Sequence, residues 1–148
     1  MRTSYAFTKV INIIENVQEN VVSFEIDNEK KCWIRNEELG KLSIQFIRRA
    51  VEEDRAIFVS YDAATGLVDF ATHINKVYVE TMEFIQQPKT GLKIQVVPRP
   101  APLFLVKTNP RFDELRSVIE NAKKNNQMLW VGTFPGDNDI LDVQIPFL

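Results

Sequence analysis

Residues 58–70 read FVSYDAATGLVDF, and residues 129–143 read LWVGTFPGDNDILDV. In each stretch, two apolar runs flank a short segment that contains glycine. Asp62 can hydrogen-bond backbone groups two residues further on, and Gly66 accepts the left-handed conformation that ends a turn. A phosphate cradle would need a helix to begin after the glycine, but residues 67–70 continue as a strand pattern. The first stretch therefore predicts a hairpin turn between two strands.

The two stretches also mark a weak internal repeat. At an offset of 72 residues (129 − 57), three consecutive apolar positions match: Ile57 with Leu129, Phe58 with Trp130, and Val59 with Val131. The order strand–strand–helix–strand–strand then occurs twice and fills the chain. Two units are too few for a solenoid, so we expect the halves to close on each other. The sequence predicts a single domain, residues 1–148, built from pseudo-repeated halves at about 1–72 and 73–148.

Two segments have the apolar spacing of amphipathic helices, residues 36–54 and 109–126. Asn36 is the expected N-cap of the first helix, and Asn109 before Pro110 is a start signal for the second. The expected buried stripe of the first helix is Leu39, Leu42, Phe46, Ile47 and Ala50. That of the second helix is Phe112, Leu115, Ile119 and Ala122.

The other patterned segments are typical of strands, and turn residues separate most of them. These segments are residues 5–14, 21–27, 31–35, 56–61, 67–71, 76–86, 93–98, 103–107, 128–134 and 140–145. The apolar stripe of each helix must cover an apolar sheet face. The sequence therefore predicts an α+β fold, a strongly bent antiparallel sheet or barrel with two covering helices.

Residues 55–126 contain, in this interpretation, four strands followed by a helix. This element order resembles that of the single-strand-binding Whirly and Pur-type folds. The resemblance rests on element order alone and implies binding of single-stranded nucleic acid.

The composition favours a soluble, cytoplasmic protein. The 148 residues carry a net charge of −2, which gives no long-range attraction for phosphate backbones or anionic lipid. Cys32 is the one cysteine, so an intramolecular disulfide is impossible. We find no signal-peptide pattern and no window near the roughly 18 apolar residues of a membrane span.

Motifs for catalysis, cofactors and metals are missing from the sequence. His73 is the one histidine and has no local motif around it. One cysteine and one histidine cannot supply the ligands that zinc prefers, and residues 137–139 lack the spacing of a calcium loop. We predict no catalytic, cofactor-binding or metal-binding residue and no cofactor. These observations leave an enzyme open but favour a non-catalytic protein.

Four aromatic residues on expected strands or strand ends are the candidates for a binding surface: Trp33, Tyr61, Trp130 and Phe134. The first hypothesis is an assembly, adaptor or inhibitor protein that acts through a protein surface, with a protein partner or self-association. The second is a single-stranded nucleic-acid binder that stacks bases on sheet aromatics, which the net charge disfavours. The third is a small-molecule site in a barrel mouth that uses Tyr61 and His73.

Overall fold

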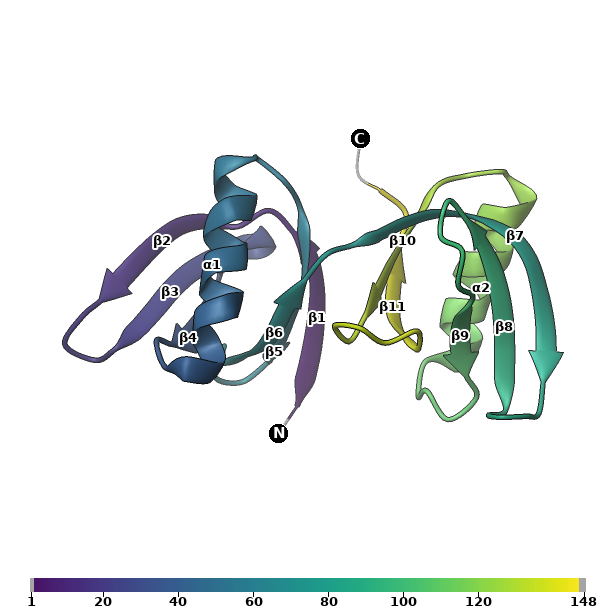
Figure 1. The fold of residues 1–148 in the computed structure, drawn as a ribbon, viewed down its shortest axis with the longest axis horizontal. Coiled ribbons are helices and arrows are strands. Elements are labelled where there is room, and N and C mark those ends of the chain that lie inside the picture. The colour runs from purple at the N-terminus through teal and green to yellow at the C-terminus, as the bar shows by residue number, and fades with distance from the viewer. Residues whose placement is uncertain (1, 147–148) are drawn as a thin grey trace. The chain divides into compact units, whose positions relative to one another are not determined.

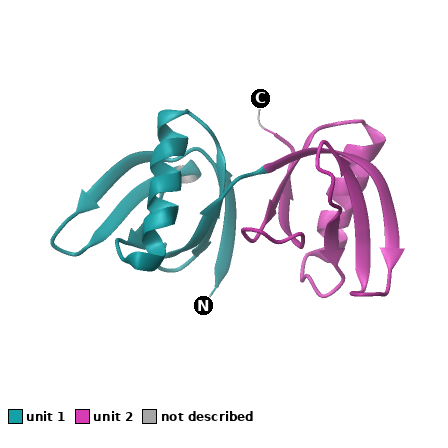
Figure 2. Cartoon of the chain, viewed as in Figure 1, with its two compact units in different colours: residues 1–74 teal, residues 75–148 magenta. Residues whose placement is uncertain are grey.

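The computed structural model describes residues 2–146 of the chain. The chain divides into two compact units, Met1–Ile74 (unit 1) and Asn75–Leu148 (unit 2), coloured separately in Figure 2. The described residues form eleven strands in three antiparallel sheets together with two α-helices, which confirms the α+β class. Within residues 2–146, neither helix has the length and apolar character that crossing a membrane would require.

Unit 1 holds two three-stranded sheets and one α-helix (Figure 1). Its elements are β1 (Thr3–Thr8), β2 (Ile11–Asn16), β3 (Val21–Ile26), β4 (Lys30–Arg35), α1 (Glu38–Glu52), β5 (Ile57–Asp62) and β6 (Val68–Thr72). A 3-10 turn over Asp27–Glu29 joins β3 to β4. The strand orders are β1-β5-β6 and β2-β3-β4.

The core of unit 1 lies between its sheets and α1. Strand β3 alternates, so Val22, Phe24 and Ile26 are buried while the residues between them are partly exposed. The helix adds Ile44, Ile47 and Ala50 to the same cluster.

The stripe expected for α1 is partly wrong, because Leu39 and Leu42 are 97% and 77% exposed. Gly40 explains the rotation of the helix. A Cβ added there would lie 2.2 Å from the carbonyl oxygen of Arg35, so the helix contacts β4 through its glycine and turns both leucines outward. The expected N-cap is also wrong: Glu37 occupies that position.

Asn36 has a different role from the one expected. Its side-chain amide donates to Glu15 Oε1 at 3.3 Å, and its backbone N–H donates to the carbonyl of Asn20. These bonds connect the end of β4 to the β2–β3 hairpin. The Asn36 side chain therefore bonds to the sheet and does not cap α1.

Unit 2 holds one five-stranded sheet and one helix. Its elements are β7 (Asn75–Ile85), β8 (Gly91–Val97), β9 (Leu103–Val106), α2 (Phe112–Lys124), β10 (Leu129–Thr133) and β11 (Ile140–Gln144). The strand order is β11-β10-β7-β8-β9. The beginning of the long strand β7 pairs with β10, and the rest of β7 pairs with β8.

The expected stripe of α2 is confirmed. Its buried residues are Phe112, Leu115, Ile119 and Ala122, and they pack on the buried side chains of the sheet, including Leu103, Leu105 and Leu129. Helix α2 begins at Phe112, slightly later than the expected start at residue 109. Asn109 Oδ1 accepts the N–H of Arg111 at 2.9 Å, so Asn109 closes a turn that precedes the helix.

A closed barrel is not formed by the described residues, which corrects the barrel alternative. In unit 1, β4 and the segment before β6 meet in one parallel bridge between Trp33 and Leu67. In unit 2, a parallel bridge between Phe104 and Asp139 joins β9 to the segment before β11. Residues 5–14, expected as one strand, divide into β1 and β2.

The element order behind the Whirly and Pur-type resemblance is wrong. Residues 55–126 contain the five strands β5 to β9 followed by α2. This agrees with the five separate strand segments expected in this range and not with the four-strand cycle. This segment also runs across the division between the units after Ile74. The four-strand cycle is therefore not a structural unit of this chain.

Candidate ligand-binding faces

In unit 2, the residue alternation of β9 points one aromatic side chain away from the core. Leu103 and Leu105 are fully buried, so Phe104 between them lies on the opposite side of the strand, where it is half-buried. Phe104 pairs with Lys93 on β8, which pairs with Glu83 on β7. We call this outer row, Glu83, Lys93 and Phe104, the Phe104 face.

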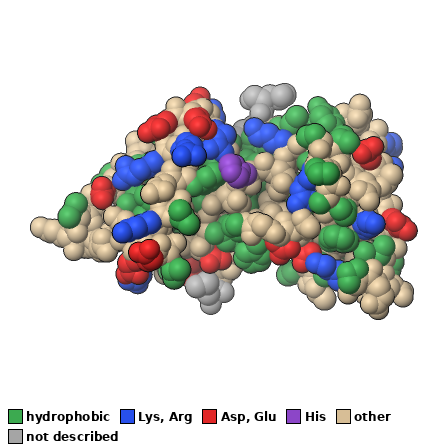
Figure 3. Space-filling view, viewed as in Figure 1, with side chains coloured by type: hydrophobic (Ala, Val, Ile, Leu, Met, Phe, Trp, Pro, Cys, Tyr) green, Lys and Arg blue, Asp and Glu red, His purple; other side chains and the backbone are tan. Residues whose placement is uncertain are grey.

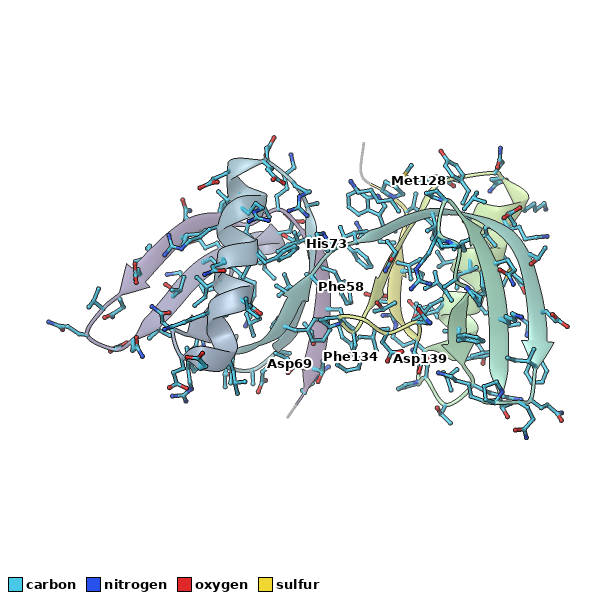
Figure 4. All side chains as sticks on the ribbon, in the orientation of Figure 1. Phe58, Asp69, His73, Met128, Phe134 and Asp139 are labelled. Atoms are coloured by element: carbon cyan, nitrogen blue, oxygen red, sulfur yellow. The ribbon has the colours of Figure 1, made fainter. Side chains whose placement is uncertain are left out.

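Two loops meet at the Phe104 face. Lys89, on the β7–β8 loop, places its Nζ 5.3 Å from the centroid of the Phe104 ring. The same Nζ lies 2.5 Å from Oδ1 of Asp139, on the β10–β11 loop. Figure 4 labels Asp139 on this loop. The lysine therefore makes a cation–π contact and an ion pair at the same time.

The β10–β11 loop is fixed by several further hydrogen bonds. The backbone carbonyl of Asn138 accepts the N–H of Phe104 at 2.9 Å. Its side-chain Oδ1 accepts from the guanidinium of Arg99. Asp137 Oδ1 accepts the backbone N–H groups of Asn138 and Asp139 at 2.6 and 3.3 Å. The loop thus holds Asp139 in place beside the ring.

Unit 1 presents an aromatic residue in a similar setting on β4. Cys32 and Ile34 are buried, so Trp33 lies on the outer side, next to Ser23 of β3 and Ile14 of β2. The guanidinium carbon of Arg35 lies 5.5 Å from the indole centroid. We call the outer row Ile14, Ser23 and Trp33 the Trp33 face.

Trp33 is held by the loop that begins with the turn at Asp62. Its Nε1–H donates to the carbonyl of Thr65 at 3.1 Å, and its backbone N–H donates to the carbonyl of Gly66 at 3.0 Å. The indole is therefore pinned at its polar edge.

Apolar side chains extend the Trp33 face along β2 and the following turn. Ile11, Ile14 and Val17 are 51%, 62% and 81% exposed. A run of this kind is a feature of protein-contact surfaces rather than of phosphate-contacting ones.

The four aromatic candidates lie in different environments. Trp33 is half-buried, and Phe134, the first residue of the β10–β11 loop, is 44% exposed. Tyr61 is half-buried and packs against the core of unit 1. Trp130 is buried on β10, with Lys76 Nζ 5.5 Å from its ring. Phe104 was missed from the sequence, although its place between two leucines on a strand was the signal that could have found it.

His73 lies beside a cation. Its Nδ1 is 3.2 Å from Nη1 of Arg55, and its ring meets Phe46 edge-on at a centroid distance of 4.8 Å. A general base needs a group, usually a carboxylate, that accepts from one ring nitrogen and orients the other. Arg55 is a donor, so this arrangement supports packing of the ring on α1 rather than acid–base chemistry.

A hollow of about 360 Å³ lies at the start of α2, lined by residues 107 and 109–114. Two of its charged residues pair with each other. Arg111 donates to both carboxylate oxygens of Glu114 and also to Asp142 Oδ1, each at 2.9 Å. Burial raises the pKa of Asp142, and Arg111 opposes that shift. The arrangement is an ion-pair network that fastens the helix start to β11.

A smaller hollow of about 210 Å³ lies in unit 1 between β4, the start of α1 and β6. Its lining includes Arg35, Glu37 and Asp69 together with the exposed Leu39. Within residues 2–146, His, Cys, Asp and Glu side chains do not gather in groups of three that could hold a metal ion.

Comparison of the chain with protein-family models, with curated proteins and with solved structures finds no match.

Proposed function

We propose that this chain is a non-catalytic protein that binds single-stranded nucleic acid, mainly through the Phe104 face. The observation that carries the proposal is the outward Phe104 ring, with the ammonium group of one lysine over it and a second lysine beside it in the sheet. Lys89 lies over the ring, and Lys93 is its neighbour across the sheet. An aromatic platform for a base beside cations for phosphate is the usual design of single-strand binders.

The connectivity of unit 2 supports this proposal. Strand β7 pairs with both β8 and β10, a helix lies between β9 and β10, and β9 meets the segment before β11 in a parallel bridge. This arrangement resembles the oligonucleotide- and oligosaccharide-binding fold, a partly open five-stranded Greek-key barrel. That fold binds ligands on its second and third strands and on two flanking loops. In unit 2 these parts correspond to β8, β9, the β7–β8 loop and the β10–β11 loop.

We also infer that the two units are pseudo-repeats with this connectivity. In unit 1, β1 and β2 together would take the place of β7, since β1 pairs with β5 and β2 pairs with β3. Strand β4 would correspond to β9, and Trp33 to Phe104. Both residues point outward from the strand before the helix, and both form a parallel bridge. The Trp33 face is therefore the second, weaker site of this proposal.

The charge distribution favours unit 2 as the main site. Unit 1 contains nine Lys or Arg against twelve Asp or Glu, and unit 2 contains nine against eight. The excess of negative charge thus belongs to unit 1, and repulsion of phosphate is weaker at unit 2. Lys and Arg side chains are interspersed with Asp and Glu on the side in view in Figure 3. We therefore expect modest affinity that depends on stacking and falls with salt.

Fluorescence polarisation with a labelled oligothymidylate of about 15 nucleotides tests the proposal. The wild-type protein should bind at about 50 mM salt and bind less tightly at about 200 mM. Phe104→Ala should weaken binding by about fivefold to 150-fold, because stacking on an aromatic ring contributes about 1–3 kcal/mol per base. Trp33→Ala should have a smaller effect.

Phe84→Ala is the matched control. Phe84 is an exposed phenylalanine that, like the half-buried Phe104, has a lysine over its ring: Lys107 Nζ lies 5.7 Å from its centroid. It pairs with the buried Leu92, so it lies on the other side of the sheet from Phe104. This variant should bind as the wild type does. Absence of binding at low salt, or equal losses in Phe84→Ala and Phe104→Ala, would contradict the proposal.

A second candidate function is an interaction with another protein through unit 1. The exposed run of Ile11, Ile14 and Val17 favours it. Light scattering of the wild type and of Ile14→Lys is the test. This function predicts a self-associated wild type that Ile14→Lys returns to monomers, whereas a monomeric wild type would leave self-association unsupported.

A further inference from the structure

Resting on the proposed function, the geometry points to a regulatory contact at the same site. We propose that the Lys89–Asp139 ion pair is a clasp over the Phe104 ring in the free protein. A phosphate group of the bound strand would open the clasp by taking the lysine ammonium from the Asp139 carboxylate. The ring would then be free to stack on a base.

The position of Lys89 means that the clasp must open before a base can reach the ring. Its Nζ lies 5.3 Å from the ring centroid, within the distance at which a stacking partner would lie. The ammonium and a base cannot occupy the same space over the ring. Binding by stacking on that side therefore requires the lysine to move.

The two ends of the ion pair differ in freedom, so Lys89 is the end that moves. Asp139 forms a parallel bridge with Phe104, and its backbone N–H donates to Asp137 Oδ1. The preceding Asn138 is tied to Phe104 and Arg99. Lys89 instead carries its charge on a flexible four-carbon stem.

The exchange of partners costs little. The side chains of Lys89 and Asp139 are 38% and 30% exposed, and partly exposed pairs contribute little to stability. A phosphate oxygen accepts from an ammonium group as a carboxylate does. The clasp is therefore strong enough to cover the ring in the absence of ligand and weak enough for a phosphate to replace it.

Asp139→Asn tests this inference with the same labelled oligothymidylate. Removing the carboxylate charge should release Lys89 and tighten binding by about twofold to fivefold at low salt, which corresponds to about one such ion pair. Asp139→Ser serves as a second variant if the asparagine protein folds poorly.

Asp137→Asn is the matched control. Asp137 lies in the same loop, and its substitution makes the same change in net charge. Its Oδ1 accepts two backbone N–H groups, which an asparagine oxygen can also accept. A clasp predicts that Asp137→Asn changes affinity by less than about twofold. If Asp137→Asn and Asp139→Asn raise the affinity equally, the change in net charge explains the effect, and the clasp is wrong.

Lys89→Gln, alone and combined with Asp139→Asn, completes a double-mutant cycle for the ion pair. It should weaken binding, because the phosphate loses its cation, and in its presence Asp139→Asn should no longer tighten binding. If the wild type binds and Asp139→Asn binds no tighter, the clasp is wrong and the proposed function stands. If neither protein binds the oligonucleotide, both proposals are wrong.

Discussion

The Trp33 face and the Phe104 face differ in what holds the aromatic ring. The indole N–H of Trp33 donates to the carbonyl of Thr65, and the backbone N–H of Trp33 donates to the carbonyl of Gly66. Exposed apolar residues extend along the neighbouring strand. Phe104 has no polar atom in its side chain, and the group over it is the movable ammonium of Lys89. Similar positions on a strand therefore carry different chemistry: unit 1 offers an apolar contact surface, and unit 2 offers an aromatic platform among lysines.

The largest expected effects come from breaking one core while the other stays intact. Most of the buried apolar residues form two clusters, one in each unit. Phe24→Ala in unit 1 and Leu115→Ala in unit 2 should each destabilise their own unit by about 2–5 kcal/mol, because each leaves a cavity among fully buried side chains. Amide hydrogen exchange should show the loss of protection confined to the mutated unit.

Cys32 supplies a second measurement for unit 1. It lies directly across from Phe24 in the β3–β4 pair. Burial raises the pKa of its thiol to about 11, so at neutral pH the thiol is protonated and shielded from alkylating reagents. Phe24→Ala should accelerate alkylation and Leu115→Ala should leave it unchanged; acceleration by both variants would argue against separate cores.

A smaller effect is expected from the ion-pair network found in unit 2. Arg111→Met should destabilise the protein by about 1–3 kcal/mol, since it leaves the largely buried Asp142 without its guanidinium. Burial already raises the pKa of Asp142, and the loss of Arg111 should raise it further. A raised pKa in the folded state means that stability is lost as the pH rises, so the variant should be less impaired at pH 4 than at pH 7.

Chemical denaturation at the two pH values measures this difference. Arg116→Met is the control, because Arg116 forms an exposed i,i+4 pair with Glu120 that should be worth less than about 0.5 kcal/mol. A loss for Arg111→Met that is the same at both pH values would show that Asp142 does not depend on its partner.

The smallest effect sharpens the comparison of the two faces directly. Lys93→Gln, next to Phe104, should weaken oligonucleotide binding severalfold and reduce the slope of affinity against salt by about one. Lys31→Gln makes the same charge change on β4 of unit 1, where Lys31 pairs with Glu25. Lys31→Gln should change the affinity for the oligonucleotide by less than about twofold. If Lys31→Gln weakens binding more than Lys93→Gln does, unit 1 and not unit 2 holds the main site.

Local patterns predicted most of the fold. The apolar spacing of α2 predicted its buried residues correctly, because the helix meets one continuous core surface. The spacing on α1 failed at Leu39 and Leu42, since the close approach of Gly40 to the Arg35 carbonyl sets the rotation of that helix. A contact between a helix backbone and a strand leaves no periodic signal in the sequence.

The candidate site was less accessible from the sequence. Trp33 and Phe134 were found as aromatic residues at strands and strand ends, but Phe104 was not singled out. Its importance comes from Lys89 and Asp139, which reach it from loops 50 residues apart in the chain. Contacts of this kind depend on strand pairing and loop conformation, which local spacing does not encode. The net charge of −2 also concealed the unequal charges of the two units.

The most direct test of the central claim is a titration of the ¹⁵N-labelled protein with unlabelled oligothymidylate, followed by amide chemical shifts. We predict that the largest shifts lie in β8, β9, the β7–β8 loop and the β10–β11 loop, with smaller shifts around Trp33. Binding without shifts in these segments of unit 2, or shifts confined to unit 1, would contradict the account.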